Sequence, residues 1–136
     1  MLDLLRFQYK EYDQGIFRPV IPLEIEYQGR SVIYQVLVDS GADVCIFHSF
    51  VAEVLGLDLT KGRKQYVMGL GGEPQSYYIH PVNIRVRGVT IPVEAGFLPS
   101  IGINQYGVVG QSGFFERFVV SFDRLKKSFQ LQQRGL

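Results

Sequence analysis

The stretch Val36-Leu37-Val38-Asp39-Ser40-Gly41-Ala42 decides how the rest of this chain is interpreted. Three apolar residues predict a buried strand, and they run directly into an acid, a hydroxyl, a glycine and a small residue. We expect Asp39 to be held at the end of a rigid strand, in a turn tight enough to need Gly41. Rigid mounting of a carboxylate is what acid–base catalysis requires.

The composition is that of one folded domain. The chain has 136 residues, of which 46% are hydrophobic and 20% charged, so it can bury a core without a metal or a disulfide framework. The formal net charge of +1 gives no electrostatic reason to expect nucleic acid or an acidic membrane as a partner. Short basic runs at 61–64 and 124–127 coincide with predicted turns, and we interpret them as solvated loops.

The number of cysteines and the lengths of the apolar runs indicate in which cellular compartment the protein is expected. Cys45 is the only cysteine, which leaves no intrachain disulfide and fits a reducing compartment. Asp3 and Arg6 fall where a signal peptide would carry its apolar stretch, and no apolar run is long enough to span a bilayer. We therefore expect a soluble, cytoplasmic protein with no membrane partner.

Strand signals dominate the chain. We expect strands at 18–27, 31–38, 44–47, 65–68, 77–86, 89–97, 106–110, 119–122 and 128–131. One helix is expected at 49–55, with Ser49 as its N-cap and Gly56 as its stop, and one or two helical turns at 111–117. About seven to nine short strands with so few helices predict an all-β fold, either a barrel or a sandwich, mostly antiparallel.

Peptide hydrolysis without a metal or a nucleophilic side chain needs a base to activate water and an acid to protonate the carbonyl oxygen. Two carboxylates that share one proton can perform both tasks, as is generally described for enzymes with paired carboxylates. The chain offers a single candidate, Asp39, because no other aspartate stands between an apolar strand and a Ser/Thr-Gly turn. If the chemistry needs a pair, the second Asp39 comes from a second chain, which a two-fold dimer supplies.

The neighbours of Asp39 have tasks in such a dimer. The Ser40 hydroxyl can bond across the axis to the partner's backbone and hold the two loops rigid. Gly41 lets the backbone approach the carboxylate pair, with its amide aimed at the carboxylate. Ala42 is small enough to leave the cleft open.

Three motifs in this chain resemble those of the retropepsin-like aspartic proteases. Asp39-Ser40-Gly41-Ala42-Asp43 is similar to the family's catalytic run, and Gly69-Leu70-Gly71-Gly72 is similar to its flap tip. The segment from Pro99 through Val108-Val109-Gly110, followed by a short helix, resembles the second signature, in which two apolar residues and a glycine brace the active-site loop. The order and spacing match from about Pro19 to Leu131.

The resemblance implies a single-domain closed β-barrel, the half-fold of acid proteases, that assembles as a two-fold homodimer with one site. It implies endopeptidase activity on extended peptides at acidic to near-neutral pH, without a cofactor or metal. Asp39 would be the catalytic residue, with Ser40 and Gly41 in the catalytic loop. The residues expected to contact substrate, form the flap or wall the apolar subsites are Val38, Ala42, Asp43, Gly69, Leu70, Gly71, Gly72, Leu98, Ile101 and Ile103.

One position departs from the family pattern. Gln111 follows Gly110, where many retroviral members carry an arginine that pairs with the acid four residues beyond the catalytic one. Asp43 therefore lacks its usual partner, and Arg6 or Arg18 is a candidate substitute. This departure puts the strength of the dimer in question more than the chemistry.

The N-terminal segment is longer than the minimal family core. We treat residues 1–17 as an N-terminal extension and residues 18–136 as the protease domain. Whether the extension joins the dimer sheet stays open.

Other interpretations compete with these. Asp39 would also fit as an ordinary turn acid, and 69–72 as a plain hairpin connection, although not as a phosphate loop, since the lysine and following helix are missing. Cys45 and His48 make a poor thiol-protease pair because Cys45 lies in an apolar strand, and His48 and His80 are too isolated for a metal site. The rival function is a non-catalytic dimeric peptide-binding module on the same fold.

Overall fold

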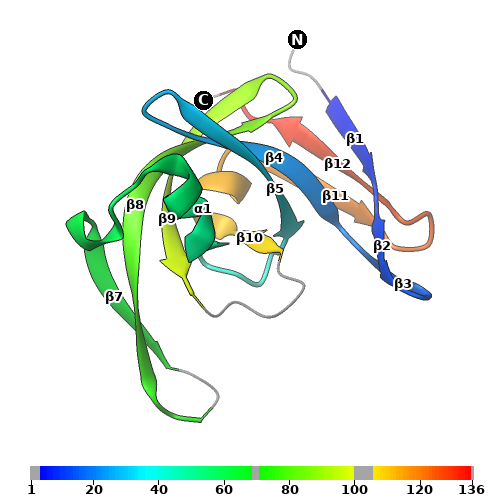
Figure 1. Ribbon diagram of the computed structural model, residues 1–136. Helices are drawn as coiled ribbons and strands as arrows, with labels where there is room; N and C mark the ends of the chain where they lie inside the picture. The colour runs from blue at the N-terminus through cyan, green and yellow to red at the C-terminus, as the bar shows by residue number, and fades with distance from the viewer. Residues whose placement is uncertain (1–3, 69–70, 100–105, 136) are drawn as a thin grey trace.

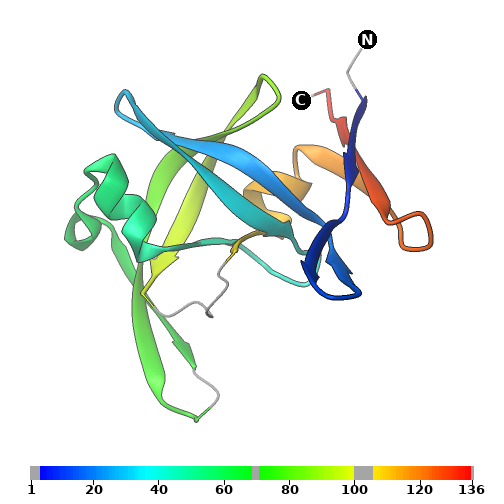
Figure 2. The same ribbon diagram turned by 45° about the vertical axis from the view of Figure 1, so that its right-hand side comes forward.

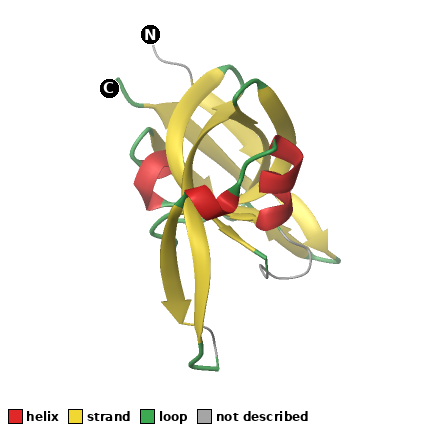
Figure 3. Cartoon of the chain, turned by 60° about the vertical axis from the view of Figure 1, so that its left-hand side comes forward, coloured by secondary structure: helices red, strands yellow, loops and turns green. Residues whose placement is uncertain are grey.

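The computed structural model describes residues 4–68, 71–99 and 106–135. In these residues the chain forms twelve strands, one short α-helix and two single helical turns. Figure 3 shows how short the helical segments are beside the strands. The predicted all-β class is confirmed, although the number of strands is larger than expected. None of the described helices is long and apolar enough to cross a membrane.

Six strands close into a barrel (Figure 1). They are β4 (Val20–Tyr27), β5 (Arg30–Val38), β10 (Gly107–Val109), β6 (Cys45–His48), β9 (Val89–Leu98) and β8 (Pro74–Val86), paired in that order. A further pairing of β4 with β8 completes the ring, and β7 (Arg63–Met68) extends it on the other edge of β8. The barrel is mixed, because β5–β10 and β6–β9 are parallel pairs.

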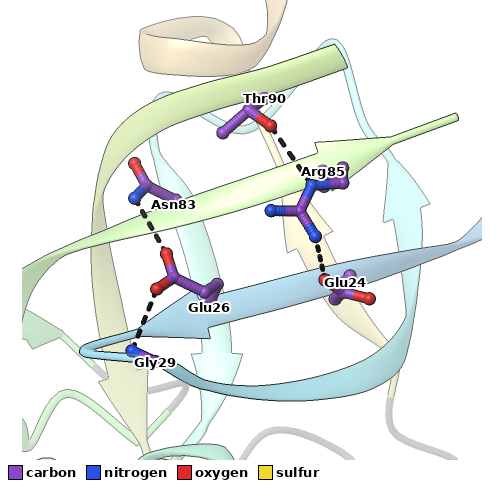
Figure 4. A network of polar contacts seen from close by, with 6 residues as sticks. All are labelled: Glu24, Glu26, Gly29, Asn83, Arg85 and Thr90. Atoms are coloured by element: carbon purple, nitrogen blue, oxygen red, sulfur yellow. Dashed lines mark hydrogen bonds and ion pairs between the residues drawn. The ribbon is translucent and has the colours of Figure 1, made fainter. Parts of the chain in front are cut away.

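Polar side chains join the strands at the β4–β8 seam (Figure 4). Glu24 forms an ion pair with Arg85, and Asn83 donates a hydrogen bond from Nδ2 to Glu26 Oε2 at 3.0 Å. The Gly29 N–H donates to the other oxygen of Glu26 at 3.1 Å. These hydrogen bonds, first from Asn83 and then from Gly29, lower the pKa of Glu26. The seam is therefore held by side chains as well as by the backbone ladder.

A second, three-stranded sheet lies beside the barrel (Figure 2). It has β12 (Ser128–Gln133) in its centre, with β1 (Leu4–Gln8) on one side and β11 (Phe118–Asp123) on the other, all antiparallel. On its inner face three buried residues, Phe118, Phe129 and Leu131, belong to the same hydrophobic core as the barrel residues. A separate hairpin, β2 (Lys10–Asp13) with β3 (Ile16–Arg18), links β1 to β4. None of these three N-terminal strands was predicted.

Helix α1 (Ser49–Leu55) has the predicted bounds but a different N-cap. His48 precedes the helix in extended backbone, and its Nδ1 accepts the Phe50 N–H at 3.0 Å, so the prediction of Ser49 as N-cap is wrong. Here an imidazole nitrogen accepts the capping hydrogen bond that a serine or aspartate side-chain oxygen usually accepts. Gly56 ends the helix with φ of 68°, as predicted.

The predicted helix at 111–117 is a single distorted turn, η2 (Gln111–Phe115). Ser112 has an extended ψ of 123° and Gly113 a positive φ of 91°, neither of which is helical. Phe114 and Phe118 are both buried in the core.

Both strands of the β7–β8 hairpin start earlier than predicted, at Arg63 and Pro74, and end where predicted, at Met68 and Val86. The pairing runs from Arg63 with Ile79 to Met68 with Pro74, so Pro74 opens β8 rather than closing a loop. Figure 1 shows this hairpin extending away from the barrel.

Candidate active site

The loop between β5 and β6 passes the end of β10, because β10 is inserted between these two strands. Asp39 follows β5 directly, as predicted, and its N–H donates to the Val109 carbonyl at 3.0 Å. The preceding N–H, of Val38, donates to the Pro19 carbonyl at 2.9 Å. Two successive residues are thus bonded to different segments of the chain, β10 and the junction between β3 and β4, which fixes the backbone from which the Asp39 side chain projects.

The loop also orients the Asp39 carboxylate itself. The Gly41 N–H donates to Asp39 Oδ1 at 2.9 Å, and the Ala42 N–H donates to the Asp39 carbonyl at 3.2 Å. A Cβ added to Gly41 would lie 3.2 Å from Asp39 Oδ1, which is tighter than ordinary van der Waals contact. Asp39 is half-buried, so the loop holds a carboxylate that is aimed but accessible.

A second segment braces the loop from the other side. The Gln111 N–H donates to the Ala42 carbonyl at 2.8 Å, and the Ser112 N–H donates to the Asp43 carbonyl at 2.9 Å. The Gln111 side chain adds a bond from Nε2 to the Ser40 carbonyl at 2.7 Å. Three carbonyls of the candidate catalytic run, those of Ser40, Ala42 and Asp43, are therefore held by two residues about 70 positions further along the chain.

Gly110 is what lets the brace come this close. A Cβ at Gly110 would lie 2.5 Å from the Ala42 oxygen and 2.6 Å from the Val44 oxygen, both backbone atoms. Before it, Val109 is fully buried while Val108 is half-buried on the opposite face of β10. Of the three residues predicted to brace the loop, Val109 accepts the Asp39 N–H and Gly110 packs against the Ala42 and Val44 carbonyls, whereas Val108 pairs with Leu37 and Ile46 on the flanking strands.

Comparison with known proteins agrees with this arrangement. Residues 21–112 match the family model described as Aspartyl protease. The chain belongs to the aspartyl protease family. The matched region contains the whole Asp39 loop, together with Gly110 and Gln111. A search of curated proteins returned no match.

Solved structures of such proteases share the fold. A retropepsin-like aspartic protease from Rickettsia conorii superposes with a TM-score of 0.68 at 18% identity, covering 98% of this chain and 94% of that chain. EIAV protease, solved with the inhibitor HBY-793, gives a TM-score of 0.51 at 23% identity, covering 69% of this chain and 82% of that one. The likeness concerns the fold alone, and it confirms the predicted retropepsin-like barrel.

In this aspartyl protease an apolar surface runs across the outer face of the barrel beside Asp39. Leu37, Val108, Ile46 and Gly96 are successive cross-strand partners on β5, β10, β6 and β9. The first three are half-buried. The Tyr77 ring lies against this row, since a Cβ on Gly96 would come 2.7 Å from Tyr77 Cε2 and 2.9 Å from Ile46 Cδ1. We call these five residues the apolar row.

Ile46 and Tyr77 were not predicted as site residues. The available signal was alternation: Cys45 and Phe47 are apolar and buried, so Ile46 between them faces the other side of the strand. Conversely, Val38 is only 2% exposed and faces the core, so its predicted place in a subsite wall is wrong.

The remaining predicted substrate contacts divide into two groups. Leu98 is half-buried at the end of β9, and Gly71 and Gly72 lie in the turn of the β7–β8 hairpin, where Gly72 has a φ of 79°. Four predicted contacts lie outside the described residues: Gly69, Leu70, Ile101 and Ile103.

A pocket of about 490 Å³ lies where α1 and η1 (Leu59–Lys61) face the base of the β7–β8 hairpin. Leu57, Tyr78 and Phe97 contribute to its lining, and Tyr77 is shared with the apolar row. At its rim Asp58 accepts the Thr60 hydroxyl at 2.6 Å and the Thr60 N–H at 3.0 Å. These bonds lower the pKa of Asp58.

Within the described ranges of one chain, Asp43 has no ion pair with a substitute partner. Among the described residues neither Arg6 nor Arg18 forms an ion pair with Asp43. The Arg18 guanidinium lies instead over the Tyr12 ring, 4.3 Å from its centroid. Gln111, at the position where many retroviral members carry an arginine, donates its side-chain amide to the Ser40 carbonyl instead of pairing with Asp43.

The cysteine and histidines behave as structural residues. Cys45 is fully buried, its thiol donates weakly to the Ser112 carbonyl at 3.7 Å, and burial raises its pKa. His48 caps α1, and His80 contacts the Leu59 carbonyl through Nε2 at 3.0 Å. Within the described ranges no group of three or more His, Cys, Asp or Glu side chains could hold a metal ion.

Proposed function

We propose that this protein is an aspartic endopeptidase, active as a two-fold homodimer in which the Asp39 carboxyls of both chains form one site. The observation that carries the proposal is the Asp39 loop, bonded to Val109 on one side and to Gln111 on the other. The hydrogen bonds hold the loop around a half-buried acid, and the chain belongs to a protease family. Together these observations favour a catalytic loop over an ordinary turn.

The chemistry needs both carboxyls. With one proton shared between them, the ionised carboxylate takes a proton from a water molecule as its oxygen attacks the scissile carbonyl carbon. The protonated carboxyl gives its proton to the carbonyl oxygen, forming a tetrahedral diol. Cleavage of the carbon–nitrogen bond follows when a hydroxyl proton returns to a carboxylate and the amine nitrogen is protonated.

The proposed substrate is an extended peptide. The apolar row, from Leu37 to Tyr77, would favour apolar side chains beside the cut. The β7–β8 hairpin would cover the peptide as a flap, with Gly71 and Gly72 at its turn, and add backbone hydrogen bonds as a neighbouring strand does. Asp43 would contact the substrate backbone, and Ser40 would bond across the axis.

Asp39→Asn tests the proposal. We expect peptide cleavage to fall by about three orders of magnitude or more, because an amide cannot exchange the proton. The dimer should persist, because the amide oxygen can still accept the Gly41 N–H. The measurements are digestion of a peptide library between about pH 4 and pH 7 and sedimentation velocity.

Two results would contradict it. Cleavage by the asparagine variant at the parent's rate would show that Asp39 is not catalytic. Peptide binding without products by the parent, unaffected by a transition-state mimic such as pepstatin, would favour the rival non-catalytic peptide-binding module.

A further inference from the structure

The β2–β3 hairpin places two positive side chains directly opposite each other. Lys10 on β2 is the cross-strand partner of Arg18 on β3. Like charges at directly opposed positions of an antiparallel pair destabilise it. Both residues are exposed, and within the described ranges neither forms an ion pair. An anion held beside this pair would relieve the repulsion.

The acids of the same hairpin do not neutralise this pair. Glu11 Oε2 accepts the Gly15 N–H at 3.1 Å, and Asp13 Oδ1 accepts the Gln14 N–H at 2.8 Å, both at the turn. Glu11 is also one residue from Lys10, so its side chain lies on the other face of the strand. The face that carries Lys10 therefore keeps its positive charge.

Two tyrosine rings hold the two cations in place. The Arg18 guanidinium lies 4.3 Å from the centroid of the Tyr12 ring, and the Lys10 ammonium lies 5.6 Å from that of Tyr106. Both distances fall within the range of cation–π attraction, about 6 Å. The two rings meet edge to face, with their centroids 6.0 Å apart. We call these four residues the cationic cluster.

Tyr106 connects the cationic cluster to the apolar row. Gly107 faces the core, because a Cβ there would lie 2.5 Å from Tyr34 Cε2 and 2.9 Å from Phe47 Cδ1. Since side chains alternate along a strand, Tyr106 and Val108 lie on the opposite face, and both are half-buried. Val108 belongs to the apolar row, so Tyr106 extends the surface of that row as far as the hairpin.

The hairpin is also anchored beside the Asp39 loop. Pro19, the residue after Arg18, accepts the Val38 N–H through its carbonyl at 2.9 Å, one residue before Asp39. Figure 1 and Figure 2 show the β2–β3 and β7–β8 hairpins extending toward the same side of the barrel, the lower side of both views. A peptide lying between the Asp39 loop and the β7–β8 hairpin would therefore pass the cationic cluster.

We propose that Lys10, supported by Arg18, binds an acidic side chain of the peptide substrate at a position remote from the cut. The inference rests on the proposed function and adds a specificity element to it. Lys10, Tyr12 and Arg18 all precede residues 21–112, the region that matches the family model. The preference for an acid would therefore come from the N-terminal extension of this chain.

The geometry indicates where in the peptide the acid should stand. Tyr106 lies two strand residues beyond Val108, and the hairpin ring of Tyr12 is a further 6.0 Å away. An extended peptide advances about 3.3 Å per residue, so the cluster lies about three or four residues from the side chain that contacts Val108. In a two-fold dimer the cluster occurs twice, and an acid would be favoured on either side of the cut.

The experiment compares peptides that share one apolar sequence around the cut. A single glutamate, or glutamine as its neutral isostere, is moved through positions about two to five residues from the cut. Fluorescence anisotropy with the full Asp39→Asn chain measures affinity, and steady-state kinetics with the parent measures KM and kcat. We expect glutamate to bind about fivefold more tightly than glutamine at one position, with the change in KM rather than kcat.

Variants of Lys10 test which group gives the preference. Lys10→Glu should remove the preference for glutamate and favour a lysine peptide instead, whereas Lys10→Arg should keep it, because the charge and the cation–π contact remain. Lys127→Glu is the matched control. The Lys127 ammonium also lies over a ring of this hairpin, 4.1 Å from the centroid of Phe17, but Phe17 is next to Arg18 and so lies on the opposite face.

Three results would overturn the inference. They are equal affinity for glutamate and glutamine at every position, an unchanged preference in Lys10→Glu, and an equal loss of preference in Lys127→Glu. Each preference is a ratio of two peptides on one protein sample, so partial unfolding of a variant does not alter it.

Binding and cleavage together separate this inference from the proposed function. A preference for glutamate that depends on Lys10, in a parent chain that cuts no peptide, would support the cationic cluster and refute the protease proposal. Cleavage of the glutamate and glutamine peptides with equal KM would refute the cluster alone. A parent that neither binds nor cuts any of the peptides would refute both.

Discussion

The geometry of the Asp39 loop depends on single atoms supplied from far along the chain. Gln111 lies 71 positions from Ser40 yet binds its carbonyl at 2.7 Å through Nε2. The bond does not touch the reacting atoms, so Gln111 is a positioning residue. Its backbone bond to Ala42 stays when the side chain is changed.

We expect Gln111→Ala to lower kcat about tenfold with little change in KM, because a less rigid loop disturbs alignment more than binding. Loss of one such hydrogen bond should also lower the free energy of unfolding by about 1 kcal/mol. The measurements are steady-state kinetics on a peptide substrate and denaturant unfolding. Ser112→Ala, which keeps the adjacent backbone bond to Asp43, is the control, and an equal loss of kcat in both variants would refute the assignment.

At the residue scale the sequence predicted the centre of the site better than its walls. Asp39, Gly41 and Gly110 were predicted because tight turns and close backbone contacts restrict the residue type. Ile46 and Tyr77 were not, because an apolar side chain looks the same in sequence whether it faces a core or a cleft. Only the cross-strand register, which brings Tyr77 against Gly96, separates the two cases.

Among the elements, the pairing of β4 with β8 closes the barrel, and side-chain contacts reinforce it. Glu26 lies at this seam, with hydrogen bonds from Asn83 and Gly29 that lower its pKa. A lowered pKa means that the carboxylate stabilises the fold at pH values above its unfolded pKa of about 4.5. That stabilisation disappears as the pH falls from there through the lower folded pKa.

Glu26→Gln should therefore lower the Tm at pH 6 and have progressively less effect as the pH approaches 3, within the acidic range in which such a protease would work. Thermal unfolding followed by circular dichroism across this range is the measurement. Glu53→Gln is a matched control, since Glu53 is exposed on α1. A Tm difference for Glu26→Gln that stays constant down to pH 3 would contradict the explanation.

Elements with local signals were predicted well. The turn at Gln28 and Gly29 and the helix ending at Gly56 follow from residues that adopt positive φ. β1 was missed because its partner, β12, lies more than a hundred residues away, and the polar residues of 10–14 hide the neighbouring hairpin. The turn at 111–115 was predicted as helix because the positive φ of Gly113 appears only in the fold.

For the whole molecule, the decisive property is that one chain carries half of the proposed catalytic pair. The motif Asp-Ser-Gly occurs once in 136 residues. A monomer that worked alone would need a second acid beside Asp39 within its own chain, whereas a dimer gains that acid by symmetry. Mixed dimers can separate these two cases, because a hybrid of parent and Asp39→Asn chains has only one carboxyl at the axis.

We expect a tenfold excess of Asp39→Asn chains to reduce parental cleavage to about a tenth, because random pairing leaves about that share of parent chains in intact pairs. The measurement is the initial rate with excess peptide substrate, after time for subunit exchange. The same excess of Asp39→Asn chains added immediately before the assay, without time for subunit exchange, serves as the control and should inhibit much less. Full parental activity in the presence of demonstrated hybrids would mean that each chain cuts on its own, and the shared site would then be wrong.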